Sequence, residues 1–164
     1  MNIGIVFYSF SGNTRAVCSF LRDGLTRNGH TARMVEIRLQ QEEKRFLEQG
    51  RAATHRLKPP LAAGMDLSAA GFDAVVFASP VWAFTYAPAL RSYLSACGGL
   101  DGKKCACFLT CGAQITSGNA LKELEGDIAG KGASVIFSVY ISGKKAGDTA
   151  YLQGRLDPLL KKIA

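Results

Sequence analysis

The sequence predicts one α/β domain, residues 1–164, with a doubly wound five-stranded parallel sheet in the order 2-1-3-4-5 and helices on both faces. The main observation is alternation: short apolar runs typical of buried strands are separated by segments with helical spacing. Such connections return the chain to a parallel sheet in a right-handed sense. A second observation is size, because 164 residues with 48% hydrophobic content suffice for one sizeable core.

The predicted elements follow in order. The apolar run at residues 2–8 is typical of a buried strand, and residues 15–21 have the spacing of a helix. Asn28 and Gly29 suit a left-handed helix end. The later elements are a strand at 32–37, a strand at 73–79 that Pro80 ends, a helix at 87–96, a strand at 105–110, a helix at 119–129, a strand at 134–140 and a helix at 149–162.

Residues 39–72 fit the alternation least well. The stretch 40–56 is polar, charged and helix-prone, and Lys58-Pro59-Pro60 ends any helix there. Two interpretations stay open: a surface helix beside the sheet, or a partly mobile excursion near the ligand.

The turn after the first strand, Ser-Phe-Ser-Gly-Asn-Thr at residues 9–14, predicts an anion site. It precedes a helix N-terminus, where backbone N–H groups lack partners and the helix dipole favours negative charge. Three hydroxyls, of Ser9, Ser11 and Thr14, are available to donate to a phosphate, and Gly12 permits close approach. The turn contains no Lys or Arg, so we expect mainly neutral donors. Dinucleotide and P-loop glycine patterns are absent from the sequence.

Two further loops follow predicted strands at the same sheet edge. Residues 79–88 contain three aromatics and two prolines, and a planar heterocycle stacked on Trp82 or Phe84 would bury their rings. The alternative is packing on a neighbouring helix or a partner subunit. Residues 110–119 are small and leave backbone groups free to face a ring edge, with Gln114 or Asn119 adding a side-chain hydrogen bond. Asn119 is also a candidate helix N-cap, in competition with Ser117.

These three loops resemble the three FMN loops of the flavodoxin-like FMN-binding family, over nearly the whole chain. The resemblance implies the doubly wound fold, non-covalent FMN, and either electron carriage or reduction of quinone-like acceptors through electron-donor and electron-acceptor partners. The sequence offers no Ser/His/Asp set and no paired carboxylates at useful spacing, so we expect no catalytic side chain and no metal, and any chemistry would belong to the cofactor. The implied cofactor-binding residues are Ser9, Phe10, Ser11, Gly12, Asn13, Thr14, Pro80, Val81, Trp82, Ala83, Phe84, Thr110, Cys111, Gly112, Ala113 and Gln114.

The chain departs from electron-carrier flavodoxins in its charge. Carriers of this family are acidic, whereas this chain has a net charge of +7. Carboxylates disfavour an anionic reduced flavin, so we expect a less strongly reducing hydroquinone here. The third loop has no aromatic residue, which would leave one flavin face free for a substrate or nicotinamide. A reductase for a small acceptor and a protein-to-protein carrier both remain open. A third hypothesis is a non-flavin phosphate-binding or regulatory module, although phospho-acceptor regulators need acidic residues that 9–14 lack.

Five cysteines in a chain that opens on a core strand predict reduced thiols and a cytoplasmic location. Cys105, Cys107 and Cys111 do not supply the four ligands of a metal site, so we expect buried core cysteines. His30 and His55 are expected at the surface. Basic residues form no concentrated stripe, which argues against nucleic-acid binding. The sequence contains no apolar run of membrane-spanning length.

Overall fold

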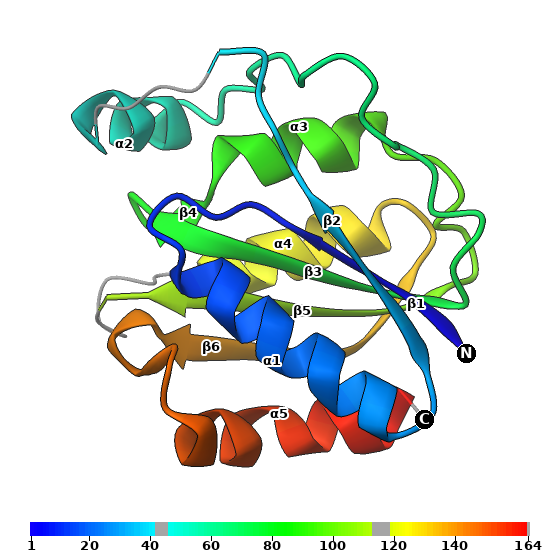
Figure 1. The fold of residues 1–164 in the computed structure, drawn as a ribbon. Helices are drawn as coiled ribbons and strands as arrows, with labels where there is room; N and C mark the ends of the chain where they lie inside the picture. Colours follow the sequence, from blue (N-terminus) through cyan, green and yellow to red (C-terminus); the bar gives the residue numbers. More distant parts are fainter. Residues whose placement is uncertain (42–45, 113–118, 164) are drawn as a thin grey trace.

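The computed structural model describes residues 1–41, 46–112 and 119–163 as a sheet between two layers of helices (Figure 1). The elements, in chain order, are β1 (Asn2–Phe7), α1 (Asn13–Arg27), β2 (Thr31–Glu36), α2 (Phe46–Thr54), β3 (Ala74–Trp82), β4 (Thr85–Tyr86), α3 (Pro88–Ala96), β5 (Lys104–Cys111), α4 (Ala120–Ala129), β6 (Ser134–Ser142), a 3-10 turn (Gly143–Lys145) and α5 (Thr149–Ile163).

The sheet has the order β2-β1-β3-β5-β6, and all neighbours along this path are parallel. This confirms the predicted order 2-1-3-4-5, with the two-residue β4 added antiparallel to β3. The central strands are buried on both faces, which is why their sequences form continuous apolar runs. The carboxyl ends of β1, β3 and β5 therefore meet at one edge, where the three loops begin.

Each face of the sheet has its own core. Helices α1 and α5 cover one face, and their buried leucines pack on Ile3, Ile5 and Phe108. Helices α3 and α4 cover the other face, where Leu90 and Leu124 belong to the core cluster. These two layers hold the strands rigidly in register, so the loops at the carboxyl edge have fixed starting points.

The prediction that Pro80 ends the third strand is wrong. β3 continues to Trp82: Pro80 pairs with Thr110 of β5, and Trp82 then pairs with Thr85 of β4. Proline is tolerated there because β3 is leaving the central ladder, so the missing N–H removes no interior ladder bond. The extension carries Val81 and Trp82 beyond the sheet edge as ordered strand rather than loop.

Helix α2 lies at the same edge as the carboxyl ends of the strands, apart from the main layers (Figure 1). It realises the helix expected within residues 40–56 and ends before the prolines. Part of its inner side packs: Ala53 is 1% exposed within the core cluster that includes Tyr8 and Trp82. The surface-helix interpretation is therefore confirmed for these residues, and the helix lies at the predicted ligand edge.

The two histidines differ from each other. His55 is exposed, as expected. His30 is half-buried rather than fully at the surface, and its Nδ1 and Nε2 have no hydrogen-bond partner among the described residues. The turn that contains it folds back against the end of α1, where the His30 N–H donates to the Leu25 carbonyl over 3.1 Å.

Candidate cofactor site

A cavity of about 580 Å³ opens at the carboxyl edge of the sheet, where the loops after β1, β3 and β5 meet. It is bounded by side chains and backbone from all three loops and from the turn after β6. Its described lining residues are Ser11, Asn13, Pro80, Val81, Trp82, Thr110, Cys111, Gly112, Gly143 and Lys144. The topology brings these residues together because parallel strands end at the same edge.

The first loop has the backbone geometry of an anion site. Gly12 is the N-cap of α1 with a φ of +88°, and no side chain caps the helix from that position. A residue with a Cβ would be strained at this φ, so the glycine fixes the turn. The N–H groups at the start of α1 have no intrahelical acceptor. Ser9 satisfies one of these N–H groups, because its Oγ accepts a hydrogen bond of 3.2 Å from the Arg15 N–H.

Thr14 joins the first loop to the third. Its hydroxyl and that of Thr110 share a hydrogen bond of 2.8 Å, and both residues are buried. The Thr14 hydroxyl therefore has a protein partner in addition to any ligand. This bond ties the N-terminus of α1 to the end of β5, and it sets the separation of two cavity walls.

A positively charged side chain from a distant part of the sequence lines the cavity. Lys144, in the turn after β6, lines the cavity beside Gly143. Gly143 packs closely on the first loop: a Cβ there would lie 3.1 Å from Asn13 Nδ2 and 3.5 Å from the Cys111 carbonyl oxygen. The expectation of mainly neutral donors concerned residues 9–14, and those residues alone could not reveal a lysine contributed after β6.

Trp82 forms an aromatic wall. It is 8% exposed, and the rings of Tyr8 and Phe10 meet it edge to face at centroid distances of 5.7 and 5.8 Å. Phe10 therefore buttresses Trp82 and is not among the described lining residues of the cavity. These contacts fix the orientation of the indole before any ligand binds.

The turn after Trp82 is strained. Ala83 and Phe84 have φ of +46° and +64°, the left-handed region that two-residue hairpin turns usually fill with Asn and Gly. Phe84 is 62% exposed at the tip and is not among the described lining residues of the cavity. Strain of this kind persists only where the surrounding structure enforces it.

A partly buried polar cluster, with Arg91 of α3 and with Glu123 and Asp127 of α4, connects these helices to β4. Arg91, 8% exposed, donates to Thr85 Oγ1 over 2.9 Å and pairs with Glu123 and Asp127 at 3.1 and 3.3 Å. The Thr85 hydroxyl donates to Glu123 over 2.6 Å. The Tyr86 hydroxyl donates to Asp127, and the Arg91 guanidinium lies 4.2 Å from the centre of the Tyr86 ring.

The pKa values of two cluster residues, Tyr86 and Glu123, are shifted. Burial, followed by the hydrogen bond to Asp127, raises the pKa of Tyr86 well above 10.0, so its hydroxyl stays protonated. Burial opposes ionisation of Glu123, but the hydrogen bonds from Thr85 and Arg56 and the charge of Arg91 outweigh it, so the pKa of Glu123 lies below 4.5. Glu123 is therefore ionised at neutral pH, and the hydrogen bonds and ion pairs of the cluster hold β4 against the helices.

The cysteines are buried, as expected, and carry no disulfide. Burial raises the pKa of Cys105 to about 12 and that of Cys111 above 9.0. Cys105 and Cys107 belong to the core. Cys111 lines the cavity, so it is the cysteine that a ligand would cover.

The structure brings together half of the residues expected to bind the cofactor. The cavity lining includes Ser11, Asn13, Pro80, Val81, Trp82, Thr110, Cys111 and Gly112. Ser9, Gly12 and Thr14 shape the first loop behind it. Phe10, Ala83 and Phe84 support or flank Trp82. Ala113 and Gln114, like Ser117, lie outside the described residues. Asn119 is the N-cap of α4, without a side-chain capping bond.

The fold and its three loops define a flavodoxin-like flavoprotein that uses FMN. The residues present fit that cofactor. A phosphate is suited by the helix N-terminus, by exposed Ser11 and Asn13, and by the charge of Lys144. The flavin ring is suited by the buried indole of Trp82. The chain belongs to the NADPH-dependent FMN reductase family, whose family model matches residues 1–147. No curated protein sequence matches the chain.

Solved structures share the fold at low sequence identity. A flavoprotein from Lactobacillus acidophilus NCFM, in complex with FMN, has a TM-score of 0.63 at 15% identity, covering 91% of this chain and 98% of that chain. The two-electron reduced flavodoxin of Megasphaera elsdenii has a TM-score of 0.57 at 18% identity, covering 91% and 98%. A WrbA-like flavodoxin from Agrobacterium tumefaciens has a TM-score of 0.61 at 15% identity, covering 98% and 97%.

Proposed function

We propose that this protein is an FMN-dependent oxidoreductase that takes electrons from NADPH and passes them to a small acceptor. The observation that carries the proposal is the cavity at the carboxyl edge, which has an anion-binding helix terminus and Lys144 among its walls together with the indole of Trp82. Membership of the NADPH-dependent FMN reductase family supports both the cofactor and the donor.

Each wall has a role in this proposal. Ser11, Asn13 and the first N–H groups of α1 hold the phosphate, with Lys144 adding the positive charge that the first loop lacks. The segments Pro80–Trp82 and Thr110–Gly112 frame the ring. Bound FMN would supply the redox chemistry between the donor and the acceptor. Buried Trp82, braced by Tyr8 and Phe10, excludes water from one side of the site.

The basic charge favours a reductase over an acidic electron carrier. The net charge of +7, with Lys144 at the cavity, attracts anionic donors such as NADPH and stabilises an anionic reduced flavin. The proposal therefore includes a less strongly reducing hydroquinone than that of a carrier. The five buried thiols without a disulfide support a reducing compartment, the cytoplasm. Within the described residues, no helix is both long and apolar enough to cross a bilayer.

The first experiment is an absorbance spectrum after incubation with FMN and desalting. Flavin absorbance bands that stay with the protein after desalting and are lost on heating establish non-covalent binding. A colourless protein would contradict FMN binding and would favour the non-flavin phosphate-binding module. Replacing Ser11 by Asp (S11D) puts a negative charge beside the phosphate and should abolish retention. S134D, at an exposed position at the start of β6 and at the opposite end of the sheet from the cavity, is the control that should retain FMN.

The second experiment separates the enzyme from the carrier. The FMN-loaded protein is mixed with NADPH under air-free conditions, first alone and then with a soluble quinone. Oxidation of NADPH that accelerates with the quinone supports the reductase. A protein that keeps FMN but leaves NADPH unchanged until a separate reductase is added is a carrier.

A further inference from the structure

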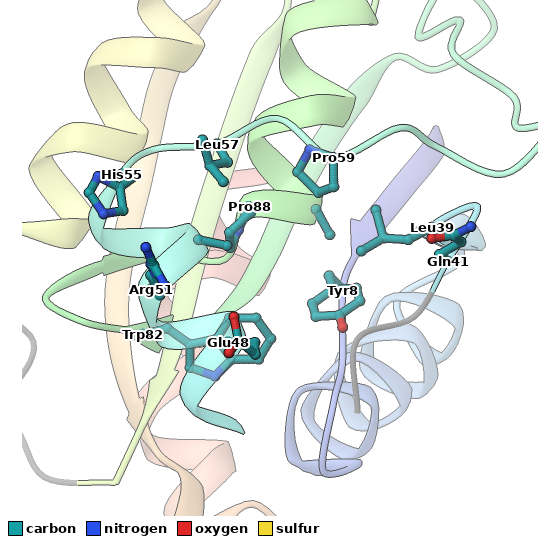
Figure 2. A pocket seen from close by; sticks show the side chains of 12 residues that line it. Tyr8, Leu39, Gln41, Glu48, Arg51, His55, Leu57, Pro59, Trp82 and Pro88 are labelled. Carbon is teal, nitrogen blue, oxygen red and sulfur yellow. The ribbon is translucent and has the colours of Figure 1, made fainter. Parts of the chain in front are cut away.

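A second cavity, of about 460 Å³, lies between α2 and the start of α3 (Figure 2). Among the described lining residues of the two cavities, Trp82 alone is common to both. The two volumes are therefore separate sites with one shared wall. Its described lining residues are Tyr8, Leu39, Gln41, Glu48, Arg51, Ala52, His55, Leu57, Pro59, Trp82, Pro88 and Ala89.

The walls of this cavity are apolar and in part aromatic. Tyr8 and Trp82 meet edge to face at 5.7 Å and are both buried, so they form a preorganised aromatic corner. Pro59 and Pro88 lie along another side, where their rings limit the backbone's freedom to collapse into the space. A cavity with fixed, largely apolar walls and few polar groups is the usual form of a small-molecule site.

The polar groups of this cavity come mainly from α2. Glu48 and Arg51 fall on one side of that helix and His55 directly follows its end, and Figure 2 shows all three around the cavity with Trp82. Arg51 is exposed and makes no ion pair with any residue in the described part of the chain. A guanidinium beside an apolar cavity is well suited to a carboxylate or sulfonate on a ligand.

We propose that this second cavity binds a planar aromatic molecule of two or three fused rings with an anionic group directed to Arg51. Size supports this class of ligand, because an apolar cavity of about 150 Å³ already holds benzene, and this one is about three times larger. The aromatic corner stacks the rings, and the guanidinium orients them. The site does not depend on FMN, so it extends beyond the proposed function.

The single tryptophan of the sequence makes the proposal testable by fluorescence. The probe is anthraquinone-2-sulfonate, which has three planar rings and one anionic group and no quinoid carbon open to thiol addition. Titrated into FMN-free protein, it should quench the emission of Trp82 along a saturable curve. An absence of saturable quenching overturns the proposal.

Variants place the binding in this cavity. A52L fills part of the volume from α2 and should weaken binding about tenfold, whereas R51Q should weaken it about fivefold by removing the charge. A129L makes the same alanine change at an exposed position at the end of α4 and should bind as the unchanged protein does. Equal affinity in A52L, R51Q and A129L would show that the probe binds elsewhere.

A calorimetric titration of the FMN-loaded protein with the same probe distinguishes the two cavities. Binding with similar affinity in the presence of FMN is expected, because the cavities are separate. Competition between FMN and the probe would mean that the probe occupies the cofactor cavity, and it would overturn this inference while leaving the proposed function intact. If the protein binds the probe but does not bind FMN, the proposed function is overturned and this inference stands.

Discussion

Arg91 of α3 donates a hydrogen bond of 2.9 Å to the hydroxyl of Thr85 in β4, and both residues are buried. Thr85 directly follows Phe84, the second of two residues with left-handed backbone in the turn after Trp82. The bond therefore connects the helix layer to the hairpin that positions the indole shared by both cavities. A buried cation thus determines the geometry of a site that it does not line.

Replacing Arg91 by Met (R91M) should lower the free energy of unfolding by about 3 kcal/mol, because it leaves Glu123 and Asp127 without their buried partner. Urea unfolding followed by circular dichroism measures the change. R22M is the control, since the Arg22 side chain is 43% exposed and pairs with its neighbour Asp23, and it should cost less than about 1 kcal/mol. Equal losses in the two variants would contradict the role of the cluster.

The strained turn predicts a stabilising substitution. At Ala83 the φ of +46° penalises any residue with a Cβ, so A83G should raise the free energy of unfolding by about 1 kcal/mol. The matched control is A63G, at an exposed position without left-handed backbone, which should lower stability because glycine is freer in the unfolded chain. Urea midpoints of both variants check the sign, and a destabilised A83G would refute the strain.

The lowered pKa of Glu123 predicts a loss of stability in acid. Its pKa is lower in the folded than in the unfolded chain, so ionised Glu123 contributes stability above the unfolded value, and this is lost as pH falls through the folded value. As the pH is lowered below about 4.5, the urea midpoint of the unchanged protein should therefore decrease, and that of E123Q should decrease less steeply. Parallel pH curves for the two proteins would show that Glu123 does not drive the change.

Cys111 should report occupancy of the cofactor cavity. Burial raises the pKa of Cys105, Cys107 and Cys111, but Cys111 alone of the three lines the cavity, whereas the other two are core residues. Iodoacetamide should modify Cys111 first in FMN-free protein, and saturating FMN should slow that step about tenfold by covering the thiol. Peptide mass spectrometry identifies the site, with C111S as the control that loses the fast step. Protection by FMN of a different cysteine would place the cofactor elsewhere.

Lys144 should add a salt-sensitive contribution to FMN binding. Removing its charge in K144Q should raise the Kd for FMN about fivefold at low salt, and the difference should shrink as salt screens the interaction. K145Q is the matched control, because the neighbouring Lys145 Nζ lies 5.1 Å from the centre of the Tyr151 ring and Lys145 does not line the cavity. Fluorescence titration with FMN gives both constants, and identical values would remove Lys144 from the site.

The sequence determined the fold class, the strand order and the three loops, because periodicity and turn chemistry are local properties. Continuous apolar runs marked the buried strands, and the position of Gly12 after the first of them marked the anion turn. The sequence could not place the end of β3. A proline usually ends a strand, but Pro80 is tolerated because β3 leaves its pairing with β5 there and then pairs with β4.

Tertiary structure alone decided which distant groups share the site. Lys144 reaches the cavity only because β6 lies beside β5 and its turn packs on Asn13, and Arg91 acts on the hairpin only through packing of α3. The role of residues 40–56 also depended on where α2 lies, since a helix-prone segment does not specify what it covers. Local patterns fix elements and turns, but contacts between residues far apart in sequence are set by packing, and those contacts define both cavities.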